Sequence, residues 1–384
     1  MQDNIKRLYC DFNATHPLRE KVKEAMWAVF ETVGNPSAVH THGRKMRDLI
    51  ERARRDMADM LKIDIDRLVF CSGATEANNL VLLSFDGPVI VSAIEHPSVL
   101  QVRGDAQICP VTTNGTVCLD ELERLLKSCS QKALVCIMAA NNETGVIQPI
   151  DDIAALVHLY GGFFHCDTVQ AVGRMPVCWR AIDSFAISAH KLGGPFGIGI
   201  LGLNASIPLH FPFKGGGQER SFRPGTENVW GIVGMAKAME LALQENWNTT
   251  ATQIYWLEHY ITTVCPEAIV IGKNAQRIPN TSMISMPNLD NTQQMIQFDL
   301  KGISVSNGSA CSSGKVRKSA VLQAMNIDPD VARGCIRISL GALTQDQDMQ
   351  QLANTWYKIH TRNNEQKQQE NAKDLFGLSV DNAL

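Results

Sequence analysis

The positions of apolar residues divide the chain into two regions with different patterns. Between residues 67 and 203, short apolar runs such as 88–91 and 133–138 are separated by segments, such as 119–127 and 150–160, in which apolar residues recur every three or four positions. The short runs predict buried strands, and the recurring pattern predicts helices. Alternating strands and helices are typical of an α/β fold in which helices cover both faces of a mostly parallel sheet.

The second region begins after a long helix predicted over residues 229–246. From residue 249 strand-like and helical patterns are mixed, which indicates a smaller α+β domain. We therefore expect a large domain over 15–248, a small domain formed by 1–14 and 249–362, and a tail over 363–384. The tail is polar, and we expect a frayed helix end or disorder. The 384 residues, 45% of them hydrophobic, suffice for two domains.

Composition narrows the classes of function. The formal net charge of −3 gives no indication of nucleic-acid binding, and no apolar run is long enough to span a membrane. The eleven cysteines form no Cys-x-x-Cys pair, and Cys109, Cys118, Cys129 and Cys136 have no histidine at zinc-finger spacing, so we expect no metal site. An odd number of cysteines without a signal peptide indicates a reducing cytoplasm.

One glycine-rich run matches a nucleotide-binding motif without its context. Residues 197–202 satisfy the spacing G-x-G-x-x-G, but Asn204 and Pro208 follow where a dinucleotide-binding helix should begin. Ile198 and Ile200 alternate with glycines as in a strand. We therefore predict a strand that returns beneath the segment around residue 191.

Lys191 is the first candidate for chemistry. It follows His190 and a short apolar strand predicted over residues 185–188, and Gly193 and Gly194 come shortly after it. A partly desolvated lysine amine at such a place is suited to Schiff-base formation. The alternative is an ordinary solvated loop charge.

Two earlier segments supply what such a lysine needs. A short strand delivers Asp167 at its carboxyl end, where ligands of open α/β sheets bind, although an aspartate there can also cap the next helix. A strand near residues 67–71 leads through Gly73 to a helix expected to begin near Thr75, and the free amides of a helix start bind phosphate. A phosphate site, a carboxylate for a protonated ring nitrogen and an imine-forming lysine are together what pyridoxal 5′-phosphate requires.

With these features the chain resembles the cysteine desulfurases of the NifS and IscS type, which are fold-type I pyridoxal-phosphate enzymes. The resemblance extends over nearly the whole chain, and its motifs follow the family's order. The matching segments are residues 9–15, 34–44, 72–76, 95–96, 141–145, 167–170, 188–191, 223–226, 309–314 and 336–341. The resemblance implies a large cofactor-binding domain and a small domain that carries Cys311.

The resemblance implies catalytic roles for two of these residues and a cofactor contact for a third. Lys191 would hold the cofactor covalently and later move the α-proton of the substrate. His96 would stack on the cofactor ring and relay protons, whereas the alternative is a histidine that merely caps the helix expected after Pro97. Asp167 would keep the pyridine nitrogen protonated.

Further contacts follow from the same resemblance. The residues near the phenolic oxygen of the cofactor would be Asn142 and Gln170. Those that hold its phosphate would be Ala74, Thr75, Ser188, His190 and, from a second subunit, Thr226. Arg337 would bind the substrate carboxylate in a bidentate pair, unless it is an outward-facing charge of its alternating strand.

Cys311 decides which reaction the resemblance implies. It lies in a run of glycines and small polar residues that indicates an exposed loop, where a thiolate can attack the sulfur of a bound cysteine. A buried, inert cysteine is the alternative. The implied function is an L-cysteine desulfurase that yields L-alanine and a persulfide on Cys311. A selenocysteine lyase, a class V aminotransferase and a non-catalytic sulfur-relay subunit are the other hypotheses.

The resemblance also implies a homodimer and a sulfur-acceptor protein. The chain departs from the family in two places. Residues 362–370 do not match the C-terminal segment with which housekeeping members dock their iron–sulfur scaffold, so that partner stays open. His16 replaces the threonine usual in the family near the expected site entrance.

Overall fold

The large domain is built on a seven-stranded sheet. The computed structural model describes residues 7–308 and 318–375, with side chains as far as residue 368. The strand order is β2-β8-β7-β6-β5-β3-β4. The strands are β2 (Leu68–Cys71), β3 (Val89–Ser92), β4 (Gln107–Cys109), β5 (Leu134–Cys136), β6 (Phe163–Asp167), β7 (Ser184–Ser188) and β8 (Gly199–Leu203).

The sheet is mostly parallel, as predicted. β3 pairs in parallel with β4 and β5, and β5, β6 and β7 continue the parallel pairing. β8 runs antiparallel to both of its neighbours, β7 and β2. The strand predicted within residues 197–202 is therefore confirmed, since Gly199 pairs with Ser188 at the end of β7.

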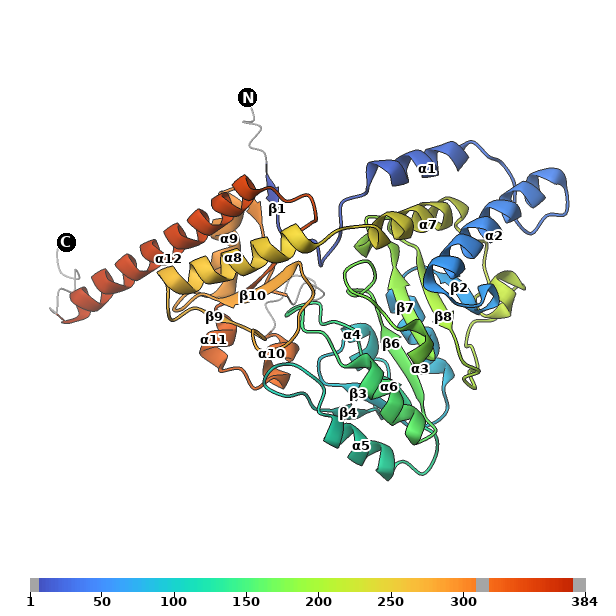
Figure 1. Ribbon diagram of the computed structural model, residues 1–384, viewed down its shortest axis with the longest axis horizontal. Coiled ribbons are helices and arrows are strands. Elements are labelled where there is room, and N and C mark those ends of the chain that lie inside the picture. Colours follow the sequence, from blue (N-terminus) through green and yellow to red (C-terminus); the bar gives the residue numbers. More distant parts are fainter. Residues whose placement is uncertain (1–6, 309–317, 376–384) are drawn as a thin grey trace, which may run out of the picture.

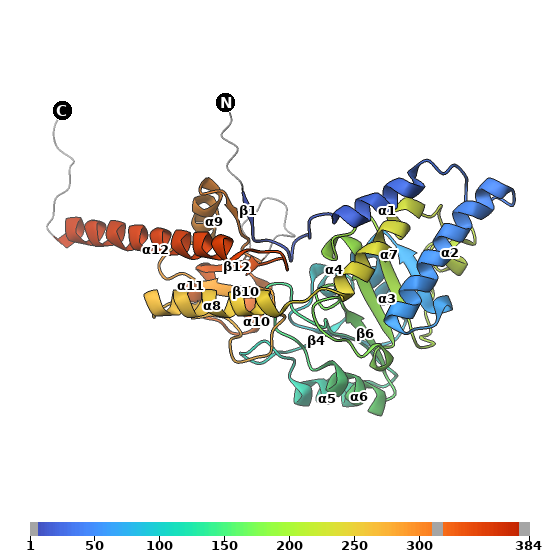
Figure 2. The same ribbon diagram turned by 45° about the horizontal axis from the view of Figure 1, so that its top comes forward.

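Helices cover both faces of this sheet (Figure 1). Side chains alternate along a strand, so Phe185 and Ile187 of β7 pack into one core and Ala186 into the other. The helices are α1 (Glu20–Phe30), α2 (Thr41–Leu61), α5 (Leu119–Ser128), α6 (Ile150–Leu159) and α7 (Val229–Leu243) on one side, and α3 (Ala74–Ser84) and α4 (Pro97–Leu100) on the other. Figure 2 shows α1 lying beside α7. The helix predicted over 229–246 ends at Leu243, three residues early.

The small domain contains two further sheets. In one, β10 (Thr281–Ser285) lies antiparallel between β9 (Ile269–Val270) and β12 (Cys335–Ser339). In the other, β1 (Leu8–Tyr9) pairs in parallel with β11 (Ile303–Ser304), so the N-terminal residues join the C-terminal part of the chain. The helices are α8 (Asn248–Val264), α9 (Asn291–Leu300), α10 (Ala320–Ala324), α11 (Pro329–Arg333) and α12 (Asp346–Leu375).

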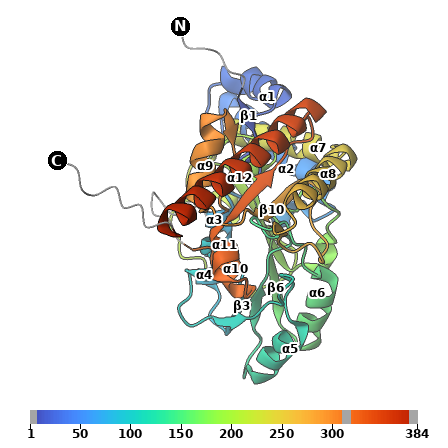
Figure 3. The ribbon, with the colours of Figure 1, turned by 90° about the vertical axis from the view of Figure 1, so that its left-hand side faces the viewer.

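The core of the small domain lies between its helices and β10 and β12. Leu257 of α8, Phe298 of α9 and Trp356 of α12 are fully buried there, and α8 and α12 lie side by side (Figure 3). α12 continues through the polar residues after 362 as far as Leu375. Asn363 in this stretch is buried and donates from Nδ2 to Asn288 O at 3.3 Å. No helix among the described residues combines the length and the apolar character needed to cross a bilayer.

Candidate active site

A cavity of about 470 Å³ lies where the carboxyl ends of β6 and β7 approach β12 of the small domain. It is lined by ten of the residues that the sequence singled out: Ala74, Thr75, His96, Asn142, Asp167, Gln170, Ser188, His190, Lys191 and Arg337. Thr226 is not among the lining residues: it is exposed and lies beside an adjoining cavity that shares Ser72 and Gly197 with the first. Cys311 lies outside the described residues.

Lys191 reaches the cavity from the turn that follows β7. A single 3-10 turn (Ala189–Lys191) carries it there, and the chain then reverses at Gly193, whose φ of +79° favours glycine. The Lys191 Nζ donates to Asn13 O at 2.5 Å and to Ala14 O at 2.8 Å. The interpretation of Lys191 as an ordinary solvated charge is therefore wrong.

Asp167 ends β6 and is only 8% exposed. Its Oδ1 accepts from Val169 N at 3.0 Å and its Oδ2 from Asn78 Nδ2 at 2.9 Å. The Asn78 amide is held in turn by His165, 2.9 Å away, and burial lowers the pKa of that histidine to about 3. No helix follows Asp167 before the short turn Trp179–Ala181, so the alternative role as a helix cap is wrong.

The start of α3 forms one end of the cavity. Gly73 precedes the helix with φ of +156°, and a side chain at Gly199 would meet its Cα at 2.6 Å, so both positions require glycine. Free backbone amides of the first turn give this helix end partial positive charge. Ser188 and His190 line the same cavity, and burial together with Lys191 lowers the pKa of His190 to about 4. At neutral pH this histidine is uncharged.

His96 caps a helix and also lines the cavity. It lies at the N-cap of α4, where its Nδ1 accepts from Ser98 N at 3.1 Å, and its ring also lines the cavity. Because Nδ1 is occupied as an acceptor, a neutral imidazole carries its proton on Nε2. The capping bond thereby fixes the tautomer of a ring that faces the cavity.

Arg337 lies in the middle of β12 and is 2% exposed, so the interpretation as an outward-facing charge is wrong. Its Nη1 donates to Asn142 O at 2.8 Å, and its Nη2 is paired with Asp11 Oδ1 at 2.5 Å. Its buried Nε has no hydrogen-bond partner within the part of the chain that the structure describes. A buried donor of this kind can be satisfied by an anionic ligand.

Three residues near the site had no role in the sequence analysis. Asp11 pairs with Arg337, and Asn13 is 1% exposed beside Lys191. Glu143, whose pKa is raised by burial, accepts from Ser319 Oγ at 2.6 Å. Residues 9–15 and 141–145 were among the matching segments, but their partners are more than one hundred positions away, so spacing alone did not reveal them.

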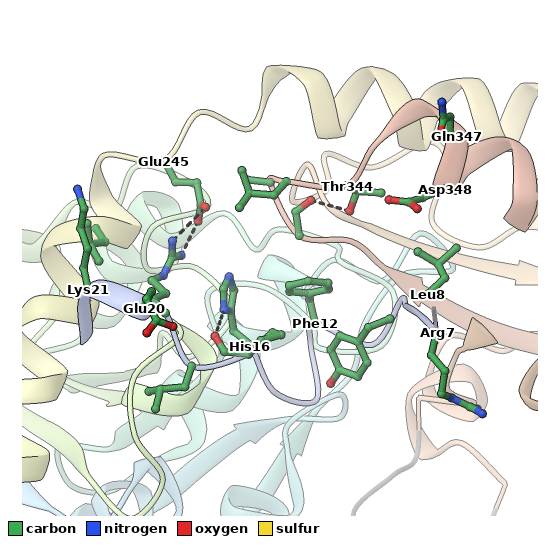
Figure 4. Close-up of a pocket in the computed structure, with 18 of the residues that line it drawn as sticks. Arg7, Leu8, Phe12, His16, Glu20, Lys21, Glu245, Thr344, Gln347 and Asp348 are labelled. Atoms are coloured by element: carbon green, nitrogen blue, oxygen red, sulfur yellow. Dashed lines mark hydrogen bonds and ion pairs between the residues drawn. The ribbon is translucent and has the colours of Figure 1, made fainter. Parts of the chain in front are cut away.

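A second cavity, of about 750 Å³, lies on the other side of the N-terminal segment (Figure 4). His16 and Phe12 line it with their rings 5.1 Å apart, and the His16 Nδ1–H donates to Pro17 O at 2.7 Å. Burial lowers the pKa of His16 to about 4. The residue that departs from the family is thus neutral and is absent from the lining of the first cavity.

The residues of the first cavity fit pyridoxal phosphate. The α3 terminus, Ser188 and His190 offer donors for a phosphate, Asp167 offers a buried carboxylate for a ring nitrogen, and Lys191 offers an amine. Their separation in sequence and convergence in space make this the candidate cofactor site.

The comparisons with known proteins agree with this geometry. The family model described as aminotransferase class-V matches residues 8–352. The chain is 36% identical over 364 residues to the cysteine desulfurase IscS of Dictyoglomus turgidum, covering 90% of this chain and 92% of the relative. It is 35% identical over 366 residues to a cysteine desulfurase of Cereibacter sphaeroides, covering 91% and 94%.

A solved structure supports the same assignment. The X-ray structure of a NifS-like protein from Rickettsia africae superimposes with a TM-score of 0.85 at 35% identity, covering 92% of this chain and 99% of the other. The chain therefore belongs to the class-V aminotransferase family and, within it, to the cysteine desulfurases of the NifS and IscS type.

Proposed function

We propose that the cavity around Lys191 is the active site of a pyridoxal-phosphate-dependent L-cysteine desulfurase, which transfers sulfur from L-cysteine to Cys311 and releases L-alanine. The observation that carries this proposal is the convergence of a lysine, a buried carboxylate, a helix start and a buried arginine on one cavity of about 470 Å³. When bound, the cofactor supplies an electron sink for the bonds broken at the α- and β-carbons of the substrate.

The cofactor is held at three points. Ala74 and Thr75 at the start of α3, with Ser188 and His190, bind the phosphate. Asp167 would keep the ring nitrogen protonated, and Lys191 Nζ would form the covalent bond. His96 would contact the ring, and Asn142 and Gln170 would lie near its phenolic oxygen.

Lys191 is the proton carrier of the site. Its Nζ is now held by the carbonyl oxygens of Asn13 and Ala14, so the amine stays inside the cavity when it is not covalently bound. Once released by the substrate amine, Nζ takes the α-proton and returns it during formation of L-alanine. Arg337 binds the substrate carboxylate: its unpaired Nε and its Nη2, which is paired with Asp11 in this structure, form the bidentate edge once the substrate replaces Asp11 at Nη2.

Cys311 is the sulfur acceptor. Gly308 lines the cavity and precedes Cys311 by three residues, so covalent reach limits their separation to about 11 Å. The thiolate attacks the substrate sulfur, an S–S bond forms, and the C–S bond breaks. Its electron pair stays with the three-carbon fragment, which takes up a proton and leaves as L-alanine.

The active unit is a homodimer. Trp27 is 73% and Phe30 53% exposed, and Phe30 lies 4.9 Å from the ring of Trp230. Exposed aromatic residues gathered in this way are typical of an interface. The exposed Thr226 lies in the loop before α7, near Trp230. In the proposed dimer it would contact the cofactor phosphate of the partner subunit.

The persulfide sulfur passes to an acceptor protein of iron–sulfur cluster assembly or of another sulfur pathway, in the cytoplasm. The membership in the cysteine desulfurases supports this step. Recombinant protein carrying ³⁵S on Cys311, mixed with a purified scaffold protein, should lose label to it. Retention of all label would contradict an iron–sulfur acceptor.

The central test uses protein reconstituted with pyridoxal phosphate, L-cysteine and a thiol reductant. We expect a yellow protein that releases equal amounts of L-alanine and sulfide. Cys311→Ala should keep the colour and lose sulfide release, whereas the matched variant Cys178→Ala, at an exposed cysteine, should keep both. Full sulfide release by Cys311→Ala would contradict the persulfide step, and a protein that stays colourless would contradict the cofactor.

A further inference from the structure

Arg174 is a buried cation that none of the roles above uses. It follows β6 and is 7% exposed. Its Nη1 donates to Asn13 Oδ1 at 3.1 Å and to Gln170 Oε1. Within the described residues, no carboxylate lies at ion-pair distance from its guanidinium. Burying a cation whose hydrogen-bond partners are all neutral lowers the free energy of unfolding. A functional role would explain why the arginine is nevertheless at this position.

Both partners of Arg174 belong to the surroundings of Lys191. Gln170 lines the candidate cofactor cavity, and its Nε2 donates to Asn13 O at 3.0 Å. The same carbonyl oxygen accepts from Lys191 Nζ at 2.5 Å. A guanidinium is a donor only, so Arg174 fixes the Gln170 amide with Oε1 toward itself and Nε2 toward the cavity side.

Asn13 extends this contact to the substrate arginine. Its Nδ2 donates to Thr281 Oγ1 at 2.8 Å and to Asn142 O at 3.2 Å. Asn142 O also accepts from Arg337 Nη1 at 2.8 Å. Asn13 therefore connects Arg174 to both cationic groups of the site: to Lys191 through its backbone carbonyl oxygen, and to Arg337 through its side chain and the carbonyl oxygen of Asn142.

The charged groups around Arg174 compensate its charge only in part, because Glu245, whose negative charge favours the charged guanidinium, is itself paired with Arg19. Arg19 is paired with Glu245 at 2.6 Å, and Arg337 is paired with Asp11. Burial, followed by the positive charge of Arg337, lowers the pKa of Arg174 to about 10, so the guanidinium is charged at neutral pH. An anionic atom close to Gln170 and Lys191 would balance this charge.

We propose that Arg174 is a positioning residue for the cofactor: it orients Gln170 and Asn13 around Lys191 and places a buried positive charge behind the phenolic oxygen. The inference rests on the proposed function. The charge stabilises the oxygen as an anion and disfavours a proton on Lys191 Nζ when that nitrogen is bonded to the cofactor. Arg174 touches neither cofactor nor substrate and acts through its two partners.

The test measures the cofactor without any substrate. Apoprotein is titrated with pyridoxal phosphate to obtain Kd, and the visible absorption of the bound cofactor is followed against pH to obtain its midpoint. In R174Q we expect the midpoint to rise by roughly 0.5 to 1 unit, since a nearby positive charge lowers the pKa of a protonated nitrogen. We expect Kd to rise about tenfold with the loss of one charge-assisted contact.

Two further variants separate charge from structure. R174K keeps the charge but is shorter, so it should keep the wild-type midpoint and bind the cofactor more weakly. R180Q removes an exposed arginine from the same stretch and should match wild type in both quantities. An R174Q protein that melts like wild type and shows the wild-type midpoint would overturn the role of Arg174 and leave the proposed function intact.

The remaining outcomes are also decisive. If R174Q does not fold, R174K carries the test, and an unchanged Kd for R174K would overturn the positioning role. A wild-type protein that binds no pyridoxal phosphate would refute the proposed function itself.

Discussion

The guanidinium of Arg337 is paired with the carboxylate of Asp11 at 2.5 Å, a contact between β12 and the N-terminal segment 326 residues earlier. The Arg337 side chain is 2% exposed and that of Asp11 is 19% exposed. The pair therefore compensates a buried charge and also holds the N-terminal segment, with Asn13 and Ala14, against Lys191.

Asp11→Asn should destabilise the folded protein. The change keeps the size of the side chain but leaves Arg337 as a buried cation without a carboxylate, which costs about 2–4 kcal/mol. Urea denaturation measures this loss. The matched control is Asp330→Asn, which breaks the exposed pair with Arg333 and should cost less than about 0.5 kcal/mol. Equal stabilities of the two variants would show that the Asp11 pair contributes nothing.

Arg337→Gln should raise the KM for L-cysteine. Loss of a charge-assisted hydrogen bond of about 1.5–3 kcal/mol corresponds to a rise of about 10- to 100-fold. The affinity for pyridoxal phosphate should change much less than the KM, because Arg337 is connected to the proposed cofactor contacts only through the carbonyl oxygen of Asn142. Arg333→Gln, at an exposed arginine, serves as the control. An unaltered KM in Arg337→Gln would place the carboxylate contact elsewhere.

The positions of Lys191 and Asp167 could be predicted from sequence because Asp167 ends one short apolar strand and Lys191 follows another, and carboxyl ends of parallel strands meet at one edge of a sheet. Arg337 was ambiguous. Because side chains alternate along a strand, Arg337 is expected on the face opposite Ile336 and Ile338. That face would be exposed in a sheet that has only one buried face. In the structure both faces of β12 are buried. Ile336 and Ile338 pack into the small-domain core, and Arg337 on the opposite face lines the candidate cofactor cavity.

Asp11, Asn13 and Arg174 could not be predicted as site residues. Each is polar and lies outside the regular elements, where a solvated side chain is the ordinary expectation. Asn13 and Arg174 are buried by contacts between the N-terminal segment and the region after β6, 157 and 161 residues apart in sequence, and Asp11 is held by Arg337, 326 residues away. No periodic pattern encodes a contact of that range.

Glu95→Gln should remove a pH dependence of stability. Burial raises the pKa of Glu95 from 4.5 to about 8. Between these values the unfolded state is ionised and the folded state holds the proton, so folded stability falls as pH rises, by at most about 1.4 kcal/mol per pH unit. A glutamine stays neutral in both states. The variant should therefore gain stability over wild type from pH 5 to pH 8, measured as urea midpoints at several pH values. A constant difference across that range would contradict the raised pKa.

Trp27→Asp should convert the proposed dimer into a monomer. Trp27 and Phe30 stack at 5.8 Å on the exposed side of α1, and a carboxylate there would have to be desolvated when a second copy covers it. Sedimentation velocity should give the mass of one chain, and cofactor affinity should fall if Thr226 of the partner subunit contacts the phosphate. Leu159→Asp is the control, because Leu159 is equally exposed, at 74%, but ends α6 on another part of the large domain. That control should remain dimeric. A dimer that survives Trp27→Asp would mean that the aromatic residues of α1 do not form the subunit contact.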